Sequence, residues 1–321
     1  MQQVLNLALP FFGLILIGYI AAKWRRLPFE GLAWLNFLVI YISLPALFYQ
    51  LLAKAPIHEL ANGRFIAGTT LATLTAFLLS LAVGYRATRG NLPEAAIVGV
   101  VGGYSNVGYM GPSLALAALG PAVAVPTALV ICFDSVLMFI LVPMLMAVAG
   151  SERRSLPRTA LDILARILLH PFIVGTLAGT AASATGFHAP EAIDRLLTYL
   201  TQLTMPCALF ALGVTVALRP VVRVPVELPP VLAIKLIGHP VLALVFLAAI
   251  GGVPPLWIAT AVLIASLPPA VSALVVAQQY RVYEDRAATA ILVGTALSMV
   301  TVTATLYLVT HDLLPVDQFG R

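Results

Sequence analysis

The helix-breaking and polar residues of this sequence gather inside two of its most apolar stretches. The stretch 102–112 reads GGYSNVGYMGP, with four glycines, an asparagine and a proline, and the stretch 266–270 reads SLPPA. Glycine and proline destabilise the interior of a continuous helix. Backbone groups that a break frees inside hydrocarbon must find partners in the protein or line a wet cavity. We therefore predict two membrane helices broken near the bilayer middle, which is typical of a transport site.

Such breaks would favour a negatively charged ligand. Pro112 and Pro269 suit the first turn of a restarted half-helix, where the missing N–H costs nothing. Each restarted half-helix then directs free N–H groups and its positive dipole end to the bilayer middle, which favours an anion, most simply a carboxylate. The alternative is that these glycines and prolines only permit close packing or a kink. The predicted substrate-binding residues are Ser105, Asn106, Gly108, Tyr109, Pro112, Ser266, Pro268 and Pro269, with an amide donor from Asn106, hydroxyls from the serines, and stacking or simple packing from the tyrosine.

Three ionisable residues lie within apolar segments. Asp134, Lys235 and His239 are placed where a charge costs several kcal/mol on insertion scales, so such a charge is rarely without a role. Two roles are open: Asp134 and Lys235 form a pair, or the lysine ammonium compensates the broken helices in place of a bound sodium ion. The structural alternative is that Lys235 extends to the inner membrane interface and Asp134 is hydrogen-bonded to nearby hydroxyl groups. His239 either titrates near neutral pH or is a core histidine bonded to a backbone carbonyl.

The elements that position these residues are membrane helices. The chain is 61% hydrophobic and 10% charged, with a mean hydropathy of +1.01, whereas soluble domains are about one quarter charged. The chain has a net charge of +5, but its basic residues lie between the apolar runs and form no cluster. We therefore expect no nucleic-acid partner. The two cysteines form no metal or redox motif, and we expect no cofactor and no metal. Apolar runs long enough to span a bilayer occupy 4–22, 31–53, 63–84, 92–118, 121–149, 163–183, 191–217, 227–250, 255–280 and 285–310.

The two halves of the chain repeat each other. Pro10-Phe11 and Gly18 recur 161 residues later as Pro171-Phe172 and Gly179, and LPALF at 44–48 is echoed by MPCALF at 205–210. Five spans in each half make the repeat inverted. The fold class predicted is an all-α polytopic membrane protein of ten helices, built as two inverted five-helix repeats with the fourth and ninth helices broken. The repeats cover 1–150 and 163–321, joined by a linker over 151–162.

Loop charges predict the orientation, because cytoplasmic loops carry an excess of Lys and Arg. With the N-terminus outside, few basic residues face outward: Lys54, Arg64, Arg195 and Arg321. Most face the cytoplasm: Lys23, Arg25, Arg26, Arg86, Arg89, Arg153, Arg154, Arg158, Arg166, Arg219, Arg223, Arg281 and Arg286. We expect a multi-pass protein of the cell (inner) membrane with both termini outside and a cytoplasmic linker.

The segment SNVGYMGP at 105–112 resembles the Asn-x-Gly-aromatic-Met-Gly-x-Pro crossover of the auxin efflux carrier family. LPAL at 44–47, Lys235 with His239-Pro240, and the Pro-Pro break are also similar. That family includes plant PIN carriers and bacterial malonate-type carriers, within a wider group of bile-acid, arsenite and riboflavin transporters. The resemblance covers nearly the whole chain.

The resemblance implies a fold shared with bile-acid-type symporters. A scaffold of spans 4–22, 31–53, 163–183 and 191–217, often dimeric, would support a mobile transport unit of 63–149 and 227–310. It also implies that Asn106 binds a substrate carboxylate. One departure is that PIN carriers place an acidic residue in the third span, where this chain offers only threonines at 69, 70, 73 and 75. Proton coupling by that route is therefore not expected.

The function indicated is a secondary transporter of small organic anions, by alternating access or an elevator-like movement at a midplane site. Malonate, malate and auxin-like acids all satisfy the charge argument. An ion-coupled symporter of other anions is the alternative. An intramembrane enzyme is disfavoured because the sequence has no HExxH or GxSxG motif. A channel would not require two matched breaks.

Overall fold

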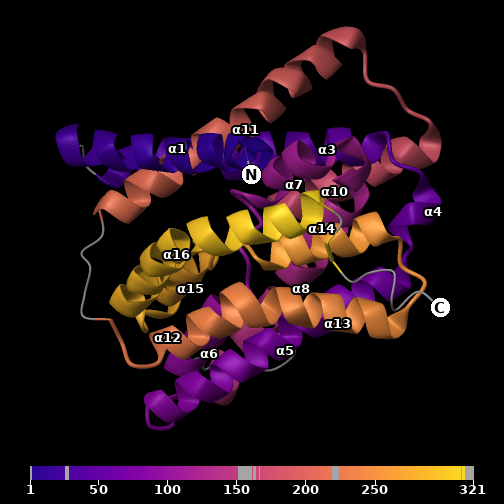
Figure 1. Cartoon of the computed structure of the whole chain (residues 1–321). Helices are drawn as coiled ribbons and strands as arrows, with labels where there is room; N and C mark the ends of the chain where they lie inside the picture. The colour runs from indigo at the N-terminus through magenta and orange to yellow at the C-terminus, as the bar shows by residue number, and fades with distance from the viewer. Residues whose placement is uncertain are drawn as a thin grey trace.

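The computed structural model describes residues 2–25, 29–150, 161, 164–165, 167–218, 224–311 and 313–314, and this part of the chain is helical (Figure 1). In the first half, α1 spans Gln2–Arg25, α2 Leu32–Phe37, α3 Leu44–Ala53, α4 Ile57–Leu60, α5 Gly63–Ala87, α6 Leu92–Gly103, α7 Gly111–Leu119 and α8 Ala124–Val148. In the second half, α10 spans Pro171–Thr185, α11 Glu191–Leu218, α12 Leu228–Ala233, α13 His239–Ile250, α14 Pro255–Ala265, α15 Ser272–Tyr280 and α16 Glu284–Thr310.

Two predicted spans contain a π-helical turn that the sequence pattern did not indicate. The turn η2 (Leu38–Ser43) joins α2 to α3, and η4 (Ile234–Gly238) joins α12 to α13. Turns of this kind inside an α-helix frequently lie at functional sites. Lys235 lies in η4. The helix runs on through both turns, so the rods 32–53 and 228–250 remain continuous.

Helix length and composition agree with a polytopic membrane protein. Within the described residues, six helical rods are long and apolar enough to cross a membrane: Leu32–Ala53, Gly63–Ala87, Pro121–Val148, Glu191–Leu218, Leu228–Ile250 and Glu284–Thr310. Shorter apolar helices cover Leu9–Trp24, Leu92–Gly103 and Pro255–Ala265. The expectation of an all-helical, multi-pass membrane protein is therefore confirmed. The count of ten spans and their inversion stay predictions.

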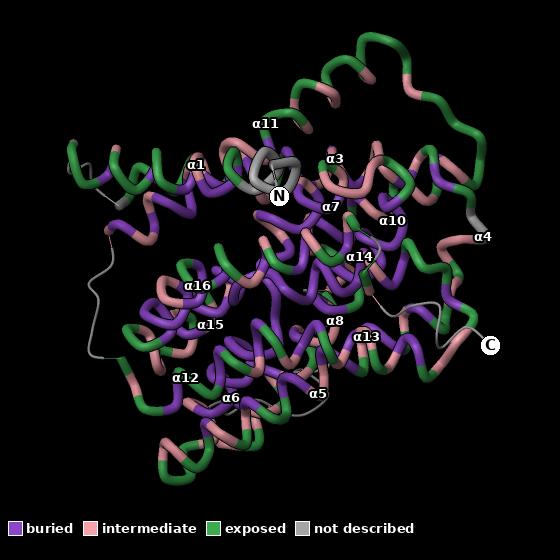
Figure 2. The backbone as a smooth tube through the Cα atoms, viewed as in Figure 1, coloured by how far each residue is buried: buried purple, intermediate pink, exposed green. Residues whose placement is uncertain are grey.

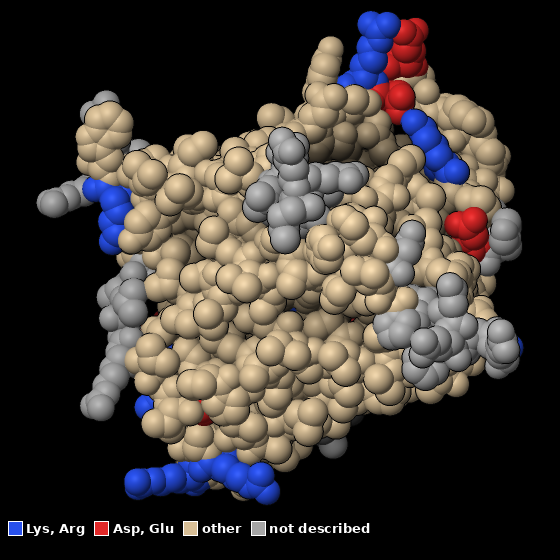
Figure 3. Space-filling view, in the orientation of Figure 1, with Lys and Arg blue, Asp and Glu red and all other residues tan. Residues whose placement is uncertain are grey.

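Many large apolar side chains are exposed on the surface. Large apolar side chains such as Leu9, Trp34 and Val300 are 70%, 80% and 73% exposed. The charged side chains of the face in Figure 3 lie at its edges, around a broad area without Lys, Arg, Asp or Glu. Exposed apolar area of this extent indicates contact with a membrane or another protein.

The helices form two groups on opposite sides of the molecule. Figure 1 shows α1, α3, α10 and α11 along the top and α5, α6, α12 and α13 along the bottom, with the broken segments between them. In the first group, Gln50 of α3 donates to Asp194 and Thr198 of α11 at 3.2 and 3.1 Å. Glu227, directly before α12, accepts hydrogen bonds from Tyr283 and Arg286 at 2.5 and 3.2 Å and so ties the second group to α16. Burial and the Glu227 carboxylate raise the pKa of Tyr283, so its phenol stays protonated and donates.

The first group is closed by two glycine contacts that repeat across the halves. Gly18 of α1 lies against the backbone carbonyl of Phe210 in α11, where an added β-carbon would stand 2.3 Å from that oxygen. Gly179 of α10 lies in the same way against Tyr49 of α3, at 2.8 Å. A shift of 161 residues converts Gly18 into Gly179 and Tyr49 into Phe210. The echo in the sequence therefore corresponds to two equivalent helix contacts.

The sixth predicted span is not continuous. The helix α10 begins only at Pro171, and His170 before it is extended, with φ −66° and ψ 131°. A residue that precedes proline is disfavoured in the α region, which accounts for the interruption. The equivalent Pro10 lies inside α1. The prediction of one unbroken helix over 163–183 is therefore wrong at His170.

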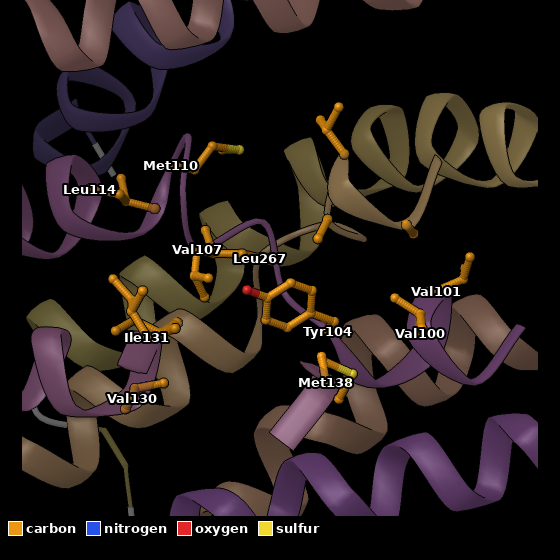
Figure 4. Packing of buried hydrophobic residues seen from close by; sticks show 14 of the residues in the cluster. Val100, Val101, Tyr104, Val107, Met110, Leu114, Val130, Ile131, Met138 and Leu267 are labelled. Atoms are coloured by element: carbon orange, nitrogen blue, oxygen red, sulfur yellow. The ribbon is translucent and has the colours of Figure 1, made fainter. Parts of the chain in front are cut away.

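The buried core surrounds the broken segments. Figure 2 shows buried backbone through the middle of the molecule and exposed backbone at the periphery. In Figure 4, Val107 and Leu267, one from each break, lie next to each other. The same figure shows Tyr104 beside Met138 of α8. The Tyr104 hydroxyl is 2.8 Å from Ser135 Oγ, also in α8, which fixes the end of α6 against α8.

Candidate functional site

Two helices are interrupted at the predicted places. The helix α6 ends at Gly103 and α7 begins at Gly111, while α14 ends at Ala265 and α15 begins at Ser272. The end of α6 packs closely against α5, because a β-carbon on Gly103 would stand 2.8 Å from the Cα atom of Phe77. The prediction that 92–118 and 255–280 are broken is thus confirmed.

The two breaks satisfy part of each other's backbone. Ser105 and Pro269 form an isolated antiparallel bridge. The N–H of Asn106 donates to the carbonyl of Pro268 at 2.9 Å, and the N–H of Ala270 donates to the carbonyl of Tyr104 at 3.0 Å. Pairing of this kind supplies the partners that freed backbone groups need away from water.

Only one of the two prolines opens a half-helix. Pro112 lies in the first turn of α7, as predicted. Pro269 does not lie in the first turn of α15, so that expectation is wrong. The bridge to Ser105 keeps Pro269 extended, and the helix resumes only after the chain turns at Ala270 and Val271. Both half-helices still begin in the region where the breaks meet.

Lys235 is enclosed at the second break. Its side chain is 0% exposed. The ammonium donates to the carbonyl of Ala265, the last residue of α14, at 2.6 Å and to Ser105 Oγ at 2.9 Å. A cation is favourable at a helix C-terminus, where free carbonyls and the negative dipole end gather. The alternative in which Lys235 reaches out to the membrane interface is therefore excluded.

A buried polar chain leads from Lys235 to Asp134. The lysine ammonium is 3.3 Å from His239 Nδ1, and His239 Nε2 is 3.1 Å from Thr73 Oγ1. Thr73 in turn lies beside the carboxyl group of Asp134, which is 1% exposed and has one oxygen without a hydrogen-bond partner. Within the described residues, Asp134 and Lys235 form no direct ion pair. In the part of the chain that the structure describes, His239 contacts Lys235 and Thr73 and no backbone carbonyl.

A cavity of about 750 Å³ opens beside the breaks. Its walls come from both helix groups and from the segment before α10. None of the described residues that line it is Asp, Glu, Lys or Arg. The lining residues are Ile40, Tyr41, Leu44, Val100, Tyr104, Ser105, Asn106, Val107, Gly108, Tyr109, Met138, Phe139, Val142, Pro143, Ala165, Leu169, His170, Pro171, Phe172, Ala270, Ser272, Val275, Val276, Gln279 and Tyr280.

The first break supplies most of the predicted binding residues to this cavity. Ser105, Asn106, Gly108 and Tyr109 line it. Asn106 is 1% exposed, and its side-chain nitrogen Nδ2 has no hydrogen-bond partner in the described chain. An amide donor left unpaired in a buried position is costly, which suits a group that meets a ligand. Tyr109 also donates to Asn36 Oδ1 of α2 at 3.3 Å.

The remaining predicted residues lie behind the cavity wall. Pro112, Ser266, Pro268 and Pro269 are not among its lining residues. The hydroxyl of Ser266 donates to the carbonyl of Leu263 in its own helix at 2.7 Å. Asp134, Lys235 and His239 are likewise outside the lining. These residues lie near the breaks but outside the cavity lining.

Sequence reasoning missed several polar residues of the site. Ser272, Gln279 and His170 line the cavity, although none was singled out. For His170 a signal was present, because it directly precedes the Pro171-Phe172 pair that marks the internal repeat. Ser272 opens α15, which only the structure locates.

A second cavity, of about 740 Å³, lies within the first helix group. Its walls include Gln50 and Lys54 of the α3 end and Glu191 and Asp194 of α11. It contains none of the predicted site residues. The 750 Å³ cavity is therefore the candidate binding site.

Comparison with known proteins identifies the family. Residues 3–306 match the family model described as "Membrane transport protein". The chain is 45% identical over 319 residues to a protein of Rhizobium meliloti (strain 1021) named "Putative malonate transporter", covering 99% of this chain and 100% of that protein. It is 24% identical over 312 residues to "Uncharacterized transporter YfdV" of Escherichia coli (strain K12), covering 95% and 97%.

These matches span almost the whole sequence, including both breaks and the residues that line the cavity beside them. The family and the names of the relatives indicate transport across a membrane and no enzymatic reaction. The resemblance carried by residues 105–112 is thereby confirmed. The chain belongs to the membrane transport proteins of the auxin efflux carrier family.

Proposed function

We propose that this chain is a secondary transporter of small carboxylates that binds its substrate in the 750 Å³ cavity beside the two breaks. The observation that carries the proposal is the unpaired Asn106 amide in a cavity that no described Asp, Glu, Lys or Arg lines. Such a cavity holds an anion through N–H donors and helix dipoles. The "Putative malonate transporter" at 45% identity supports a carboxylate of malonate size.

The fold proposed for this function is the inverted repeat of ten spans. The equivalence of the Gly18 and Gly179 contacts under the 161-residue shift supports this proposal, as do the matched interruptions between α6 and α7 and between α14 and α15. In this proposal α1, α2, α3, α10 and α11 form the scaffold, and 63–149 with 227–310 form the moving unit. Exposed Leu9, Ile17 and Trp34 on the scaffold suit lipid or a homodimer contact. Chemical crosslinking of the purified protein tests the dimer, which a monomer-only result would remove.

The structure fits an inward-facing state in the predicted orientation. The cavity is lined by Val142 and Gln279, which lie in the halves of α8 and α15 expected on the cytoplasmic side. Labelling a Gln279→Cys variant in sealed vesicles tests this. We expect faster reaction with a membrane-impermeant thiol reagent added from the cytoplasmic side. Faster reaction from the outside would reverse the proposed orientation or state.

Lys235, His239 and Asp134 are proposed to compensate charge or couple an ion. The ammonium at the α14 C-terminus takes the position that a bound cation would take, and the chain of His239 and Thr73 connects it to Asp134. This arrangement offers an acidic group from α8 where the third span has none. Ion-coupled symport by this path is the alternative form of the proposed function.

Counterflow in proteoliposomes tests the proposal. Vesicles loaded with unlabelled malonate should accumulate labelled malonate, because a carrier exchanges its substrate across the membrane. Vesicles without protein and vesicles with an excess of external malonate serve as controls. A folded, correctly inserted protein that gives no exchange of malonate, malate or an aromatic carboxylate would contradict the proposal.

A further inference from the structure

His170 stands in the wall of the cavity with an unused side chain. It is the residue before α10, and it belongs to the first helix group, whereas Asn106 belongs to the break between α6 and α7. Both residues line the same cavity. Among the described lining residues, His170 is the one whose side chain can carry a positive charge.

The ring of His170 is held in place by aromatic neighbours. Its centroid is 4.7 Å from the ring of Phe139 in α8 and 4.6 Å from the ring of Phe172 in α10, the second in a T-shaped arrangement. Phe172 also lies against Gly108 of the first break, where an added β-carbon would be 3.4 Å from its ring. One phenylalanine ring therefore separates the histidine from the break.

The hydrogen-bond state of the ring points to one free donor. Nδ1 is buried and has no partner in the described chain, and neither ring nitrogen forms a hydrogen bond there. The tautomer of a histidine is set by the bond its other nitrogen makes. Neither nitrogen has an acceptor in the described chain, so the protein does not fix the tautomer. A ligand acceptor at Nε2, the nitrogen that is not among the buried unpaired atoms, would select the tautomer with its proton there.

We propose that His170 binds the second carboxylate of a small dicarboxylate whose first carboxylate meets Asn106. This proposal rests on the proposed function and adds its substrate class. A carboxylate at Nε2 would accept the free N–H, and it would also favour the imidazolium form, so the bond becomes charge-assisted. The aromatic neighbours fix the ring, which makes His170 a specificity-determining residue of the cavity.

The test compares malonate with monomethyl malonate, in which an ester replaces one carboxylate. Binding of each to the purified full-length chain is measured by isothermal titration calorimetry. The wild type should bind malonate about tenfold or more tightly than the monoester, because hydrogen bonds to charged groups are the stronger ones. His170→Phe keeps the aromatic stack and should reduce this preference to about twofold or less. His170→Gln restores a donor and should recover part of the preference.

His188→Phe is the matched control, because His188 lines the other cavity. Its preference for malonate should equal that of the wild type. A His170→Phe protein that keeps the full preference overturns the proposal. So does a wild type that binds both ligands equally, although carboxylate transport then still stands. A folded wild type that binds neither ligand and exchanges no carboxylate removes both proposals.

Discussion

The two breaks meet at one place, yet they use their residues in different ways. The first break, 104–110, leaves the Asn106 side chain unpaired beside the cavity. The second break, 266–271, turns its serine hydroxyl back to Leu263 and receives the Lys235 ammonium at the end of α14. In the proposed transporter the two breaks therefore have separate roles: the first faces the ligand, and the second holds the Lys235 ammonium. Segments that match in the sequence repeat can therefore have different hydrogen-bonding partners.

Among the substitutions that test these two roles, loss of the Lys235 ammonium should have the largest effect on transport. Lys235→Met removes the ammonium that donates to the Ala265 carbonyl and to Ser105 Oγ in a buried site, leaving only the weaker contact between these two groups at 3.5 Å. A buried group left unsatisfied costs about 1–3 kcal/mol. We expect malonate counterflow to fall by roughly 100-fold or more. The exposed Lys54→Met is the control and should transport normally. Unchanged transport with unchanged pH dependence would remove any coupling role for Lys235.

Substitution of Asn106 and of Ser266, one in each break, should show directly whether the two breaks have different roles. Asn106→Ala should weaken malonate binding by roughly tenfold or more, because the free amide is the expected donor to the carboxylate. Ser266→Ala should change binding by about twofold or less, since its hydroxyl bonds only to Leu263. Calorimetric titration measures both.

Gln202→Ala, which deletes an exposed amide from α11, is the control for Asn106. Equal losses in the Asn106 and Ser266 variants would mean that both breaks bind the ligand. The proposed division of roles would then be wrong.

The smallest effect should be on stability rather than on binding. Gly103→Ala places a β-carbon 2.8 Å from the Cα atom of Phe77, so α5 and α6 must separate, at about 1–3 kcal/mol. Thermal unfolding in detergent should occur several degrees lower, as the usual scaling of stability with temperature indicates. Gly111→Ala meets no atom closer than 3.6 Å and should unfold near the wild-type temperature. Equal unfolding temperatures would show that the end of α6 is not fixed by this contact.

Much of the helix layout could be predicted from composition alone. The apolar runs are long, and hydrocarbon leaves a chain few conformations other than helix. The breaks were also predictable, because glycine and proline act locally. The π-helical turns η2 and η4 and the interruption at His170 were not visible in the apolar pattern, since none of them alters the hydropathy of its segment.

The site could be predicted only where its residues are neighbours in the sequence. Ser105, Asn106, Gly108 and Tyr109 belong to one break, and all line the cavity. The contact of His239 with Thr73 joins residues 166 positions apart and depends on how α5 packs against α13. Pro269 was assigned to a helix start because its local preference was considered without the bridge to Ser105. The positions of these residues depend on long-range packing, which local sequence preferences do not reveal.

The glycine contacts of the first helix group have a consequence for how the chain can be divided. Gly18 lies on Phe210 and Gly179 lies on Tyr49, so each seam joins one residue from either side of the linker. A fragment ending at residue 150 would leave Gly18 and Tyr49 facing lipid without their counterparts. Because both contacts join helices of different halves, we expect either half alone to fold less stably than the whole chain.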